Sequence, residues 1–586
     1  MKRIIIILLV VTAVVAAVLV TYTYTRRAPQ AADLLPESTL VFLDIPDLSK
    51  ARADFSKTEL YALWHEPEVQ AFLAKPLAAL HETIVNYGAP KESAVMDEIL
   101  DAAQGEVFLA LTKINILPTP SPALVLGVDT RHRRLEVAAA MHELQKRLKS
   151  SDPAIHITES KFLGVNYAMW EARPGISICQ ASLDSLFVLT VGEDTMRDLI
   201  ACYAGQTPRN FTRLSASSKY RDVLQHTSRN KDFLAYVNVQ EILSLAGPFL
   251  ALAPQTAGLY QKVSRLQTSA ASMTFVNGGI EDIGLVSYSS DAPDVAPPVQ
   301  RKTLALTTPE TLVYWTSSLN LPALYDQTMQ SLSQAGNANI MAGVGFFQQM
   351  LNNNGVRIRE DLLQKIGPEC ALLLNWRPGT RAPDCAFVAE ISSTNGILSA
   401  LDGTMNALNS ATLGDQSSWD DTEFAGQRLR TVHTKTNLAA PTYAATDKFF
   451  LFASTPDCAR QLLAQLRNAN PTLTQNERYV QSTKSLPTGG SSYLYADLRG
   501  LFEPLYTTAR QTWPERGENT LVDLKKLPAT PTIAKHLFPF VSATVEEPRQ
   551  ETTVSFSPFG KALTLVAGIG GAIWVSDVFG PTGLSQ

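Results

Sequence analysis

The sequence predicts an α+β protein: two tandem copies of a mainly antiparallel sheet domain with helices covering one face, preceded by a transmembrane helix. Three observations predict this fold class. Apolar, strand-like segments occur in pairs separated by short turns, which favours antiparallel pairing over βαβ crossovers. One series of motifs occurs twice, at an interval near 260 to 270 residues. An apolar run without charges lies near the start of the chain.

Length and composition agree with a multidomain globular protein. The chain has 586 residues, of which 45% are apolar and 18% charged, so it is long enough for two to four domains and too apolar to be disordered. The net charge is only −5. No patch dense in lysine and arginine is interleaved with aromatic residues, so we expect no nucleic acid partner.

The first element, residues 1–27, is predicted to be a signal anchor. Lys2 and Arg3 precede an apolar run at residues 4–20, which would be about 25 Å long as a helix. Tyr22 and Tyr24 follow, where an interfacial aromatic belt would lie. A cleavable signal peptide is the alternative, but bulky residues occupy the expected cleavage region. We therefore expect an uncleaved single-pass anchor with residues 28 onward exported.

The first copy of the repeated unit is predicted at residues 33–290. An amphipathic helix at 134–148 has its apolar residues at helical spacing on one face. The remaining predicted elements are strand 39–45, a helical stretch at 48–87, strands 107–112, 123–129, 165–171, 176–181, 186–191 and 233–239, a helical region up to residue 266, and a terminal strand pair at 271–276 and 283–289.

The second copy is predicted at residues 303–558, after a proline-rich linker at 291–302 that composition indicates to be extended and semi-rigid. Eight matches recur in the same order, which chance does not readily produce. The matched segments are 36–42 and 309–314, 105–111 and 367–374, 122–129 and 383–391, 162–167 and 424–429, 184–189 and 447–452, 194–200 and 457–463, 220–239 and 479–498, and 272–289 and 542–557.

The C-terminal segment, residues 559–586, contains an uncharged apolar stretch at 562–576. As a helix this stretch would be about 22 Å long, which is short for a membrane span. Gly568 and Ala572 form a small-xxx-small pair that suits close helix packing in a bilayer. A second membrane element and a segment that docks on the last domain therefore remain alternatives.

The five cysteines include no CxxC pair, so zinc-ribbon and thioredoxin-like sites lack their basic spacing. Cys370 and Cys385 lie on two segments that we predict to be neighbouring strands. A single disulfide is one interpretation, and two small buried hydrophobic residues is the favoured one.

Catalytic residues cannot be assigned, and no metal or cofactor is expected. No two of the eight histidines lie three or four residues apart, and phosphate-loop, nucleophile-elbow and dinucleotide motifs do not occur. Local context favours structural roles for the residues that attract attention. They are His65 with Glu66 (a surface histidine), Asp184 and Asp447 (turns before strands), Asp194 and Asp457 (helix starts), and Asn238 and Asp497 (caps or turns at strand ends, the least explained match).

The opening motif Leu35-Pro36-Glu37-Ser38-Thr39-Leu40 and the later Gly105-Glu106 strand resemble those of a family of uncharacterised bacterial envelope proteins, a domain of unknown function. Members of that family typically begin with a membrane segment followed by a Leu-Pro-x-x-Thr strand. The resemblance implies bacterial origin and an envelope location, and it carries over no catalytic residue. Together with the predicted anchor, we expect the chain in the cytoplasmic membrane with its bulk in the periplasm. The second copy departs from the motif, since Thr308-Pro309 replaces Leu-Pro.

These observations favour a non-enzymatic binding or scaffolding protein anchored to the lipid bilayer. Its partner would be an envelope protein, a lipid or a glycan, and a cleft between the two copies would be the place to hold a ligand. Two alternatives remain. One is a hydrolase of envelope polymers whose site has no linear motif, and the other is a subunit of a membrane complex held by both terminal apolar segments.

Overall fold

The computed structural model describes residues 29–87, 101–115, 121–151, 156–173, 176–207, 211–252, 263–291, 295–334, 338–377, 380, 383–392, 396–412, 417–434, 440–468, 470–512 and 523–561. The predicted anchor at residues 1–27 and the apolar stretch at 562–576 lie outside this range. Within it, no helix is both long and apolar enough to cross a bilayer. Below, the first half means the described residues up to 291, and the second half means those from 295 onward.

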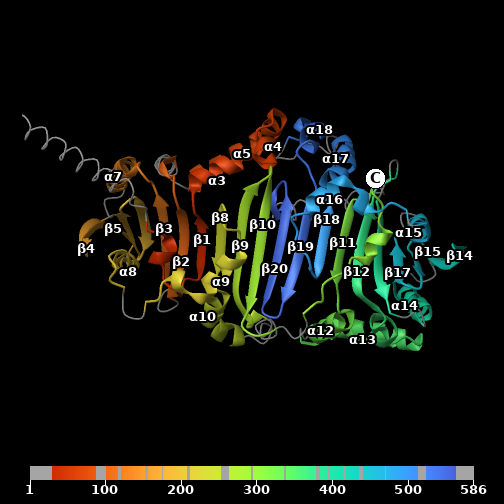
Figure 1. Cartoon of the computed structure of the whole chain (residues 1–586). Helices are drawn as coiled ribbons and strands as arrows, with labels where there is room; N and C mark the ends of the chain where they lie inside the picture. The colour runs from red at the N-terminus through yellow and green to blue at the C-terminus, as the bar shows by residue number, and fades with distance from the viewer. Residues whose placement is uncertain are drawn as a thin grey trace, which may run out of the picture.

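One antiparallel sheet of 20 strands runs through the described part of the chain (Figure 1). In the first half, the strand order is β4-β5-β6-β7-β3-β2-β1-β8-β9-β10. The bounds of these strands are β1 Val41–Ile45, β2 Val107–Asn115, β3 Ser121–Asp129, β4 His156–Phe162, β5 Val165–Arg173, β6 Ile176–Leu183, β7 Leu186–Val191, β8 Phe233–Val237, β9 Leu266–Val276 and β10 Gly279–Tyr288. The predicted antiparallel pairing is thus confirmed.

The second half continues the sheet in the mirrored order β20-β19-β18-β11-β12-β13-β17-β16-β15-β14. Each strand therefore has a counterpart in the first half with the same neighbours. The bounds are β11 Val313–Ser318, β12 Ile366–Asn375, β13 Asp384–Ile391, β14 Ser417–Phe424, β15 Gln427–Thr434, β16 Thr442–Ala445, β17 Phe449–Ala453, β18 Ser492–Ala496, β19 Phe540–Glu547 and β20 Gln550–Ser557.

The register of the strands also corresponds between the halves. In each half, one row of directly paired residues crosses six neighbouring strands. In the first half the row is Val125, Ala110, Phe42, Tyr236, Ala270 and Leu285. In the second half it is Ala386, Leu373, Tyr314, Tyr495, Val541 and Phe556. Above each row, an aromatic pair packs edge to face: Tyr220 on Tyr236, and Tyr479 on Tyr495.

The two halves meet through β10 and β20, which pair antiparallel from Ile280 opposite Ser557 to Ser287 opposite Gln550. In the two rows of paired residues described above, Leu285 of the first half corresponds in position to Phe556 of the second half. The sequence alignment of Ser287–Ser289 with Ser555–Ser557 is therefore shifted by three residues. Short polar triplets recur easily in strands, which explains the misalignment. The linker residues 295–301 contain no helix or strand, and the Val299 backbone N–H donates to the Gly490 carbonyl at 3.0 Å.

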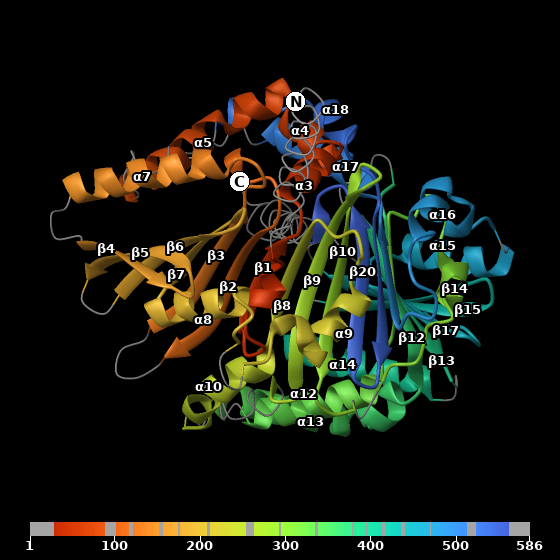
Figure 2. The same cartoon turned by 60° about the vertical axis from the view of Figure 1, so that its left-hand side comes forward.

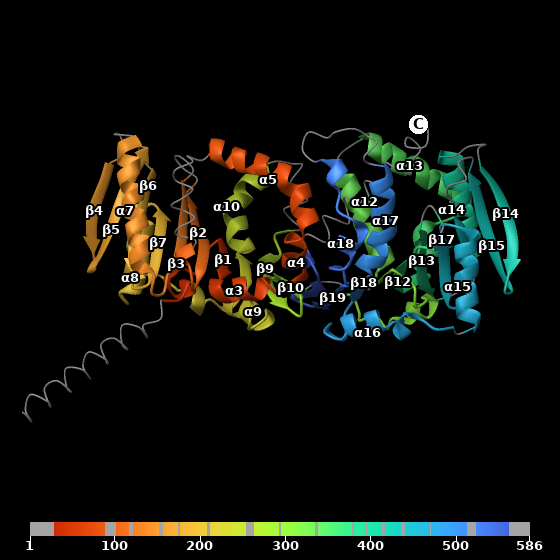
Figure 3. The ribbon, with the colours of Figure 1, turned by 90° about the horizontal axis from the view of Figure 1, so that it is seen from above.

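Helices cover both faces of the sheet, so the prediction of a single covered face is wrong (Figure 3). In β7, Leu186 and Val188 pack with α8 (Glu193–Tyr203) and α9 (Ser218–His226), whereas Phe187 packs on the opposite side with α7 (Arg134–Ser151). In β17, Leu451 faces α15 (Pro456–Asn468) and α16 (Glu477–Thr483), and Phe450 faces α14 (Ile397–Thr412). Such strands are apolar at consecutive positions and must be buried on both sides.

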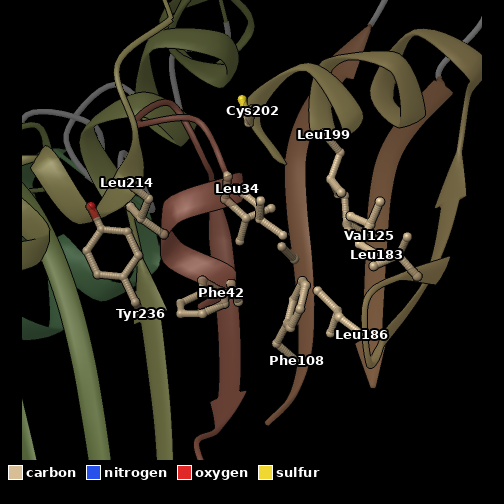
Figure 4. Packing of buried hydrophobic residues seen from close by; sticks show 14 of the residues in the cluster. Leu34, Phe42, Phe108, Val125, Leu183, Leu186, Leu199, Cys202, Leu214 and Tyr236 are labelled. Carbon is tan, nitrogen blue, oxygen red and sulfur yellow. The ribbon is translucent and has the colours of Figure 1, made fainter. Parts of the chain in front are cut away.

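The first half has its main core between the sheet and α2 (Ala31–Leu34), α8 and α9 (Figure 4). Phe42 and Phe108 point into it from β1 and β2, with ring centroids 6.1 Å apart. Gly127 lies opposite Phe108, and a Cβ there would come within 2.1 Å of the ring. The glycine therefore makes room for the aromatic side chain.

The predicted helical stretch at 48–87 is three helices: α3 (Leu48–Phe55), α4 (Glu59–Trp64) and α5 (Pro67–Tyr87). Asp47 caps α3 by accepting from the Lys50 N–H, and Thr58 caps α4 by accepting from the Tyr61 N–H. The caps and the proline at the start of α5 divide the stretch. The predicted helical region before residue 266 contains α10 (Val239–Leu252).

The remaining helices gather at the two ends of the strands (Figures 1 and 2). At one end, α4 and α5 of the first half lie beside α17 (Leu498–Thr512) and α18 (Thr530–Ala534) of the second half. At the other end lie α10, α12 (Leu321–Gln334) and α13 (Ala338–Asn353). The first of these ends thus places elements of the two halves next to each other.

All five cysteines are free thiols. Cys370 and Cys385 lie on the neighbouring strands β12 and β13, as predicted, but Cys370 pairs with Ala389 and Cys385 with Leu374. They are therefore not opposite each other, and no disulfide joins them. Cys370 is buried, as the favoured interpretation expects, whereas Cys385 is exposed.

Candidate binding cleft between the two halves

A cavity of about 570 Å³ lies where the two halves meet. The first half contributes the tip of the β9–β10 hairpin, and the second half contributes α16, the start of α17 and the segment after α18. The residues that line it are Val276, Asn277 and Glu281 from the first half and Arg478, Gln481, Ser482, Lys484, Ser485, Asp497, Arg499, Leu537, Phe538, Pro539 and Phe556 from the second. Its volume is in the range of small-molecule sites.

The apolar part of the cleft is built on two stacked phenylalanines. The rings of Phe538 and Phe556 lie 5.3 Å apart, with an angle of 26° between their planes. A Cβ at Gly279 would come within 2.6 Å of Phe538 and 2.8 Å of Phe556. The hairpin reaches this stack through Asn277 and Gly278, whose φ angles of 51° and 78° suit a two-residue turn of type I′.

The polar wall contains an ion pair that also caps a helix. Arg478 donates to Asp497 Oδ2 at 3.2 Å, and Asp497 Oδ1 accepts from the Gly500 N–H at the start of α17, also at 3.2 Å. Arg499 donates to Glu503 at 2.8 Å. Both arginines on this wall therefore have carboxylate partners from the protein itself.

Two charged residues of the cleft differ from these arginines. Glu281, on β10, and Lys484, just after α16, form no ion pair with any residue that the structure describes. The Lys484 ammonium donates only to the neutral Gln481 Oε1, at 2.8 Å. The cleft thus presents one free negative and one free positive side chain, each from a different half.

Next to Leu537 of the cleft, a group of charged residues links α4 and α5 to the end of α18. The two ring nitrogens of His536 lie 2.7 Å from Glu59 Oε2 and 3.1 Å from Glu66 Oε1. Lys535 Nζ lies 2.7 Å from the same Glu66 oxygen, and its hydrogen bond, with that of His536, lowers the pKa of Glu66. Since two carboxylates can only accept, the imidazolium form of His536 satisfies both contacts. We call these four residues the His536 clasp.

A second cavity, of about 640 Å³, lies within the first half, between α8, α9 and the strands β2 and β3. Its lining includes the carboxylates of Glu37, Asp194, Asp198 and Glu241 and the ammonium groups of Lys113 and Lys219. Burial, followed by the nearby Asp194, raises the pKa of Asp198. This cavity involves one half only, and it lacks the aromatic stack of the cleft.

In each half, an acid near the start of a strand binds the segment that precedes the first strand; Glu106 is half-buried and Glu369 is buried. Glu106 accepts from the Ala31 N–H at 3.0 Å, and Glu369 accepts from the N–H and hydroxyl of Thr303 at 2.8 and 2.7 Å. This role explains the repeated glycine-then-glutamate motif. Sequence reasoning used that motif for alignment and missed its function.

The first half adds a buried acid, Asp44, beside the half-buried Glu106. Asp44 occupies the position on β1 that Thr316 occupies on β11. Burial raises the pKa of Asp44 to about 7, against the opposing field of Lys231. Burial and then the Asp44 charge raise the pKa of Glu106 to about 8. The two acids interact, so the pair titrates as a unit.

The residues singled out in the sequence take structural positions. Asp184 is at a tight turn with φ of 54°, and Asp457 and Asp194 lie in the first turns of α15 and α8. His65 is exposed, with Nδ1 2.8 Å from the Tyr61 carbonyl. Asp447 lies in the turn between β16 and β17.

The least explained sequence match now has a physical reason. Asn238 and Asp497 cap α10 and α17, accepting from the Glu241 and Gly500 N–H groups. Asp497 also lines the cleft, and Asn238 lines the second cavity with Asp194. The described residues contain no group of three His, Cys, Asp or Glu side chains arranged to hold a metal ion.

Sequence reasoning missed the cleft residues because they come from four segments far apart in the chain. Glu281, Lys484, Phe538 and Phe556 share no motif, and only the β10–β20 junction brings them together. The expectation of a cleft between the copies was the one available signal.

Comparison with known proteins gives a family and no function. No curated protein and no solved structure matches the chain. A sequence profile described as "Protein of unknown function (DUF3352)" matches residues 5–532. Since the match spans most of the sequence, the chain belongs to this family of proteins of unknown function.

Proposed function

We propose that this chain is a membrane-anchored extracytoplasmic binding protein of a bacterial envelope, which holds a small ligand in the cleft between its two halves. The observation that carries the proposal is the cleft itself: both halves line it, and it combines a phenylalanine stack with the free charges of Glu281 and Lys484. A concave site with an apolar floor and few convergent polar groups is the usual form of a small-molecule site.

The proposal includes a tandem duplication, with copies at residues 33–290 and 303–558 joined by the linker 291–302. The mirrored strand order and the corresponding rows of paired residues support it. A duplicated unit that pairs through its last strand creates a junction with walls from both copies. The ligand site is then a product of the duplication.

The membrane location rests on the sequence. The uncharged run at residues 4–20, flanked by Lys2 and Arg3, supports a single-pass anchor with the sheet exported to the periplasm. A ligand of such a protein would come from the envelope.

Binding is favoured over hydrolysis because, among the described residues of the cleft, only one of the two carboxylates, Glu281, is free of an ion pair. Asp497 accepts hydrogen bonds from Arg478 and from the Gly500 N–H. A general acid or base needs a pKa matched to its task and a free approach to substrate. Asp497 is occupied by structural contacts instead.

Native mass spectrometry of the full chain, released from its own membrane, tests the proposal. We expect a small molecule to remain bound to the wild type and to be lost from Ser485→Trp, because Ser485 lines the cleft and is exposed enough to accept an indole ring without disturbing the core. Ser399→Trp, on the exposed side of α14, is the matched control and should keep the ligand. Equal occupancy in both variants would contradict a site in the cleft.

A further inference from the structure

We infer that the ligand of the cleft is a zwitterion with an apolar body, which places its cationic group near Glu281 and its anionic group near Lys484. This inference rests on the proposed function and adds the chemical class of the ligand. It follows from the charged side chains of the cleft that have no partner of opposite charge among the described residues.

The charged residues of the cleft divide into two kinds. Asp497, Arg478 and Arg499 have partners of opposite charge within 3.2 Å. Glu281 and Lys484 have none among the described residues, although both line the same cavity. Glu281 is half-buried, and a charge that is partly removed from water is costly unless a counter-charge meets it, so it favours a cationic ligand group. Lys484 is exposed, and its ammonium group can approach an anionic group of a ligand in the cleft.

The two free charges come from opposite sides of the junction. Glu281 is on β10 of the first half, directly opposite Phe556 of β20, and Lys484 follows α16 of the second half. A ligand that satisfies both must extend across the cleft. A simple anion would leave Glu281 unsatisfied and be repelled by it, and a simple cation would be repelled by Lys484.

The apolar body of the ligand would pack against the apolar residues of the cleft. The Phe538 and Phe556 rings, with Val276, Leu537 and Pro539, form a continuous apolar lining. Stacked aromatic rings offer a wide apolar surface to aliphatic chains and to other rings. Two sources supply this chemistry: a single-chain lipid with an ethanolamine phosphate headgroup, and a short peptide with a large apolar side chain.

The experiment is a binding titration of the full chain, held in micelles of the uncharged detergent dodecyl maltoside, which brings no zwitterion of its own. The probes are lyso-phosphatidylethanolamine, the dipeptide Phe-Phe, and anionic lyso-phosphatidylglycerol for comparison. We expect one of the two zwitterions to bind and thereby to identify the source. The anionic lipid should bind at least tenfold more weakly than lyso-phosphatidylethanolamine if the lipid is the ligand.

Charge variants test the placement. Glu281→Gln and Lys484→Gln should each weaken binding of the zwitterion about tenfold, equivalent to about 1.4 kcal/mol. Glu281→Gln should strengthen binding of lyso-phosphatidylglycerol, because it removes the repulsion. The exposed Glu360→Gln and Lys448→Gln are matched controls away from the cleft, and both should bind as the wild type does.

The outcomes separate this inference from the proposed function. If Ser485→Trp abolishes binding and both charge variants leave it unchanged, the cleft is a binding site and the zwitterion inference is wrong. If neither zwitterion binds the wild type, the inference is wrong as well. If binding survives Ser485→Trp, the proposed site itself is wrong.

Discussion

Replacing Asp44 by threonine should make the stability of the protein less dependent on pH. Asp44 is buried beside the half-buried Glu106, and partial or full removal from water raises the pKa of both. When the pKa of a carboxyl group is higher in the folded than in the unfolded chain, the folded protein is more stable with that group neutral than with it ionised. Its contribution to stability is therefore complete below pH 4 and is lost as the pH rises through the folded pKa.

The size of this effect on the free energy of unfolding follows from the shift in the pKa of Asp44. The pKa of Asp44 rises from 3.8 to about 7, and each unit corresponds to about 1.4 kcal/mol. By linkage, the ionisation of Asp44 alone should cost the folded protein roughly 2.5 kcal/mol between pH 5 and pH 8. Asp44→Thr should remove this loss and also reduce the contribution of Glu106, because the Asp44 charge is the second cause of that shift.

The assay is the urea midpoint of unfolding at pH 5 and pH 8, for the wild type and for two reciprocal variants. Threonine is the residue that the second half has at the equivalent position, Thr316, which is also buried. Asp44→Thr should flatten the pH profile, and Thr316→Asp should steepen it by placing an acid near Glu369. Parallel profiles for the wild type and Asp44→Thr would refute the argument that buried ionisation limits stability at high pH.

Two further predictions concern the junction. His536→Ala should lower the free energy of unfolding by about 1–3 kcal/mol, because it removes the buried side chain that contacts both Glu59 and Glu66, although Lys535 stays near Glu66. His65→Ala, at an exposed position, should change it by less than about 0.5 kcal/mol, and equal effects in thermal unfolding would contradict the clasp. Gly279→Ala should cost about 1–3 kcal/mol, because its Cβ would come within 2.6 Å of Phe538, and Gly343→Ala in α13, with nothing within 4 Å, should be neutral or stabilising in the same assay.

The strand pairs could be predicted because the relevant information is local. In β2 and β12, the glycine-glutamate start and the apolar run that follows are visible in the sequence, and both strands lie where the motif indicates. The helix start that the sequence places at Asp457 is confirmed by α15, whose cap is Thr455: its hydroxyl accepts from the Cys458 N–H. Local signals such as caps and short apolar runs need no knowledge of tertiary contacts.

The coverage of both faces was missed although a signal was present. Leu186, Phe187, Val188 and Leu189 are consecutive apolar residues, and a strand with one solvent-exposed face would alternate with polar residues. The β10–β20 junction has no such local signal, since its pairing joins strands far apart in the chain. The cleft depends on that junction, so its residues could not be assembled from sequence alone. The acid at Asp44 was missed for a related reason: its burial depends on β2 and β8 on either side.

The most direct test of the central claim is an experimental structure of the full chain, purified from its own membrane without added ligand. Our account predicts density in the cleft, packed against Phe538 and Phe556 and extending between the Glu281 carboxylate and the Lys484 ammonium. The same preparation of Ser485→Trp should lack that density. Density confined to the second cavity within the first half, or a cleft filled only by water while a co-purified molecule binds elsewhere, would contradict the claim that the junction of the two halves is the binding site.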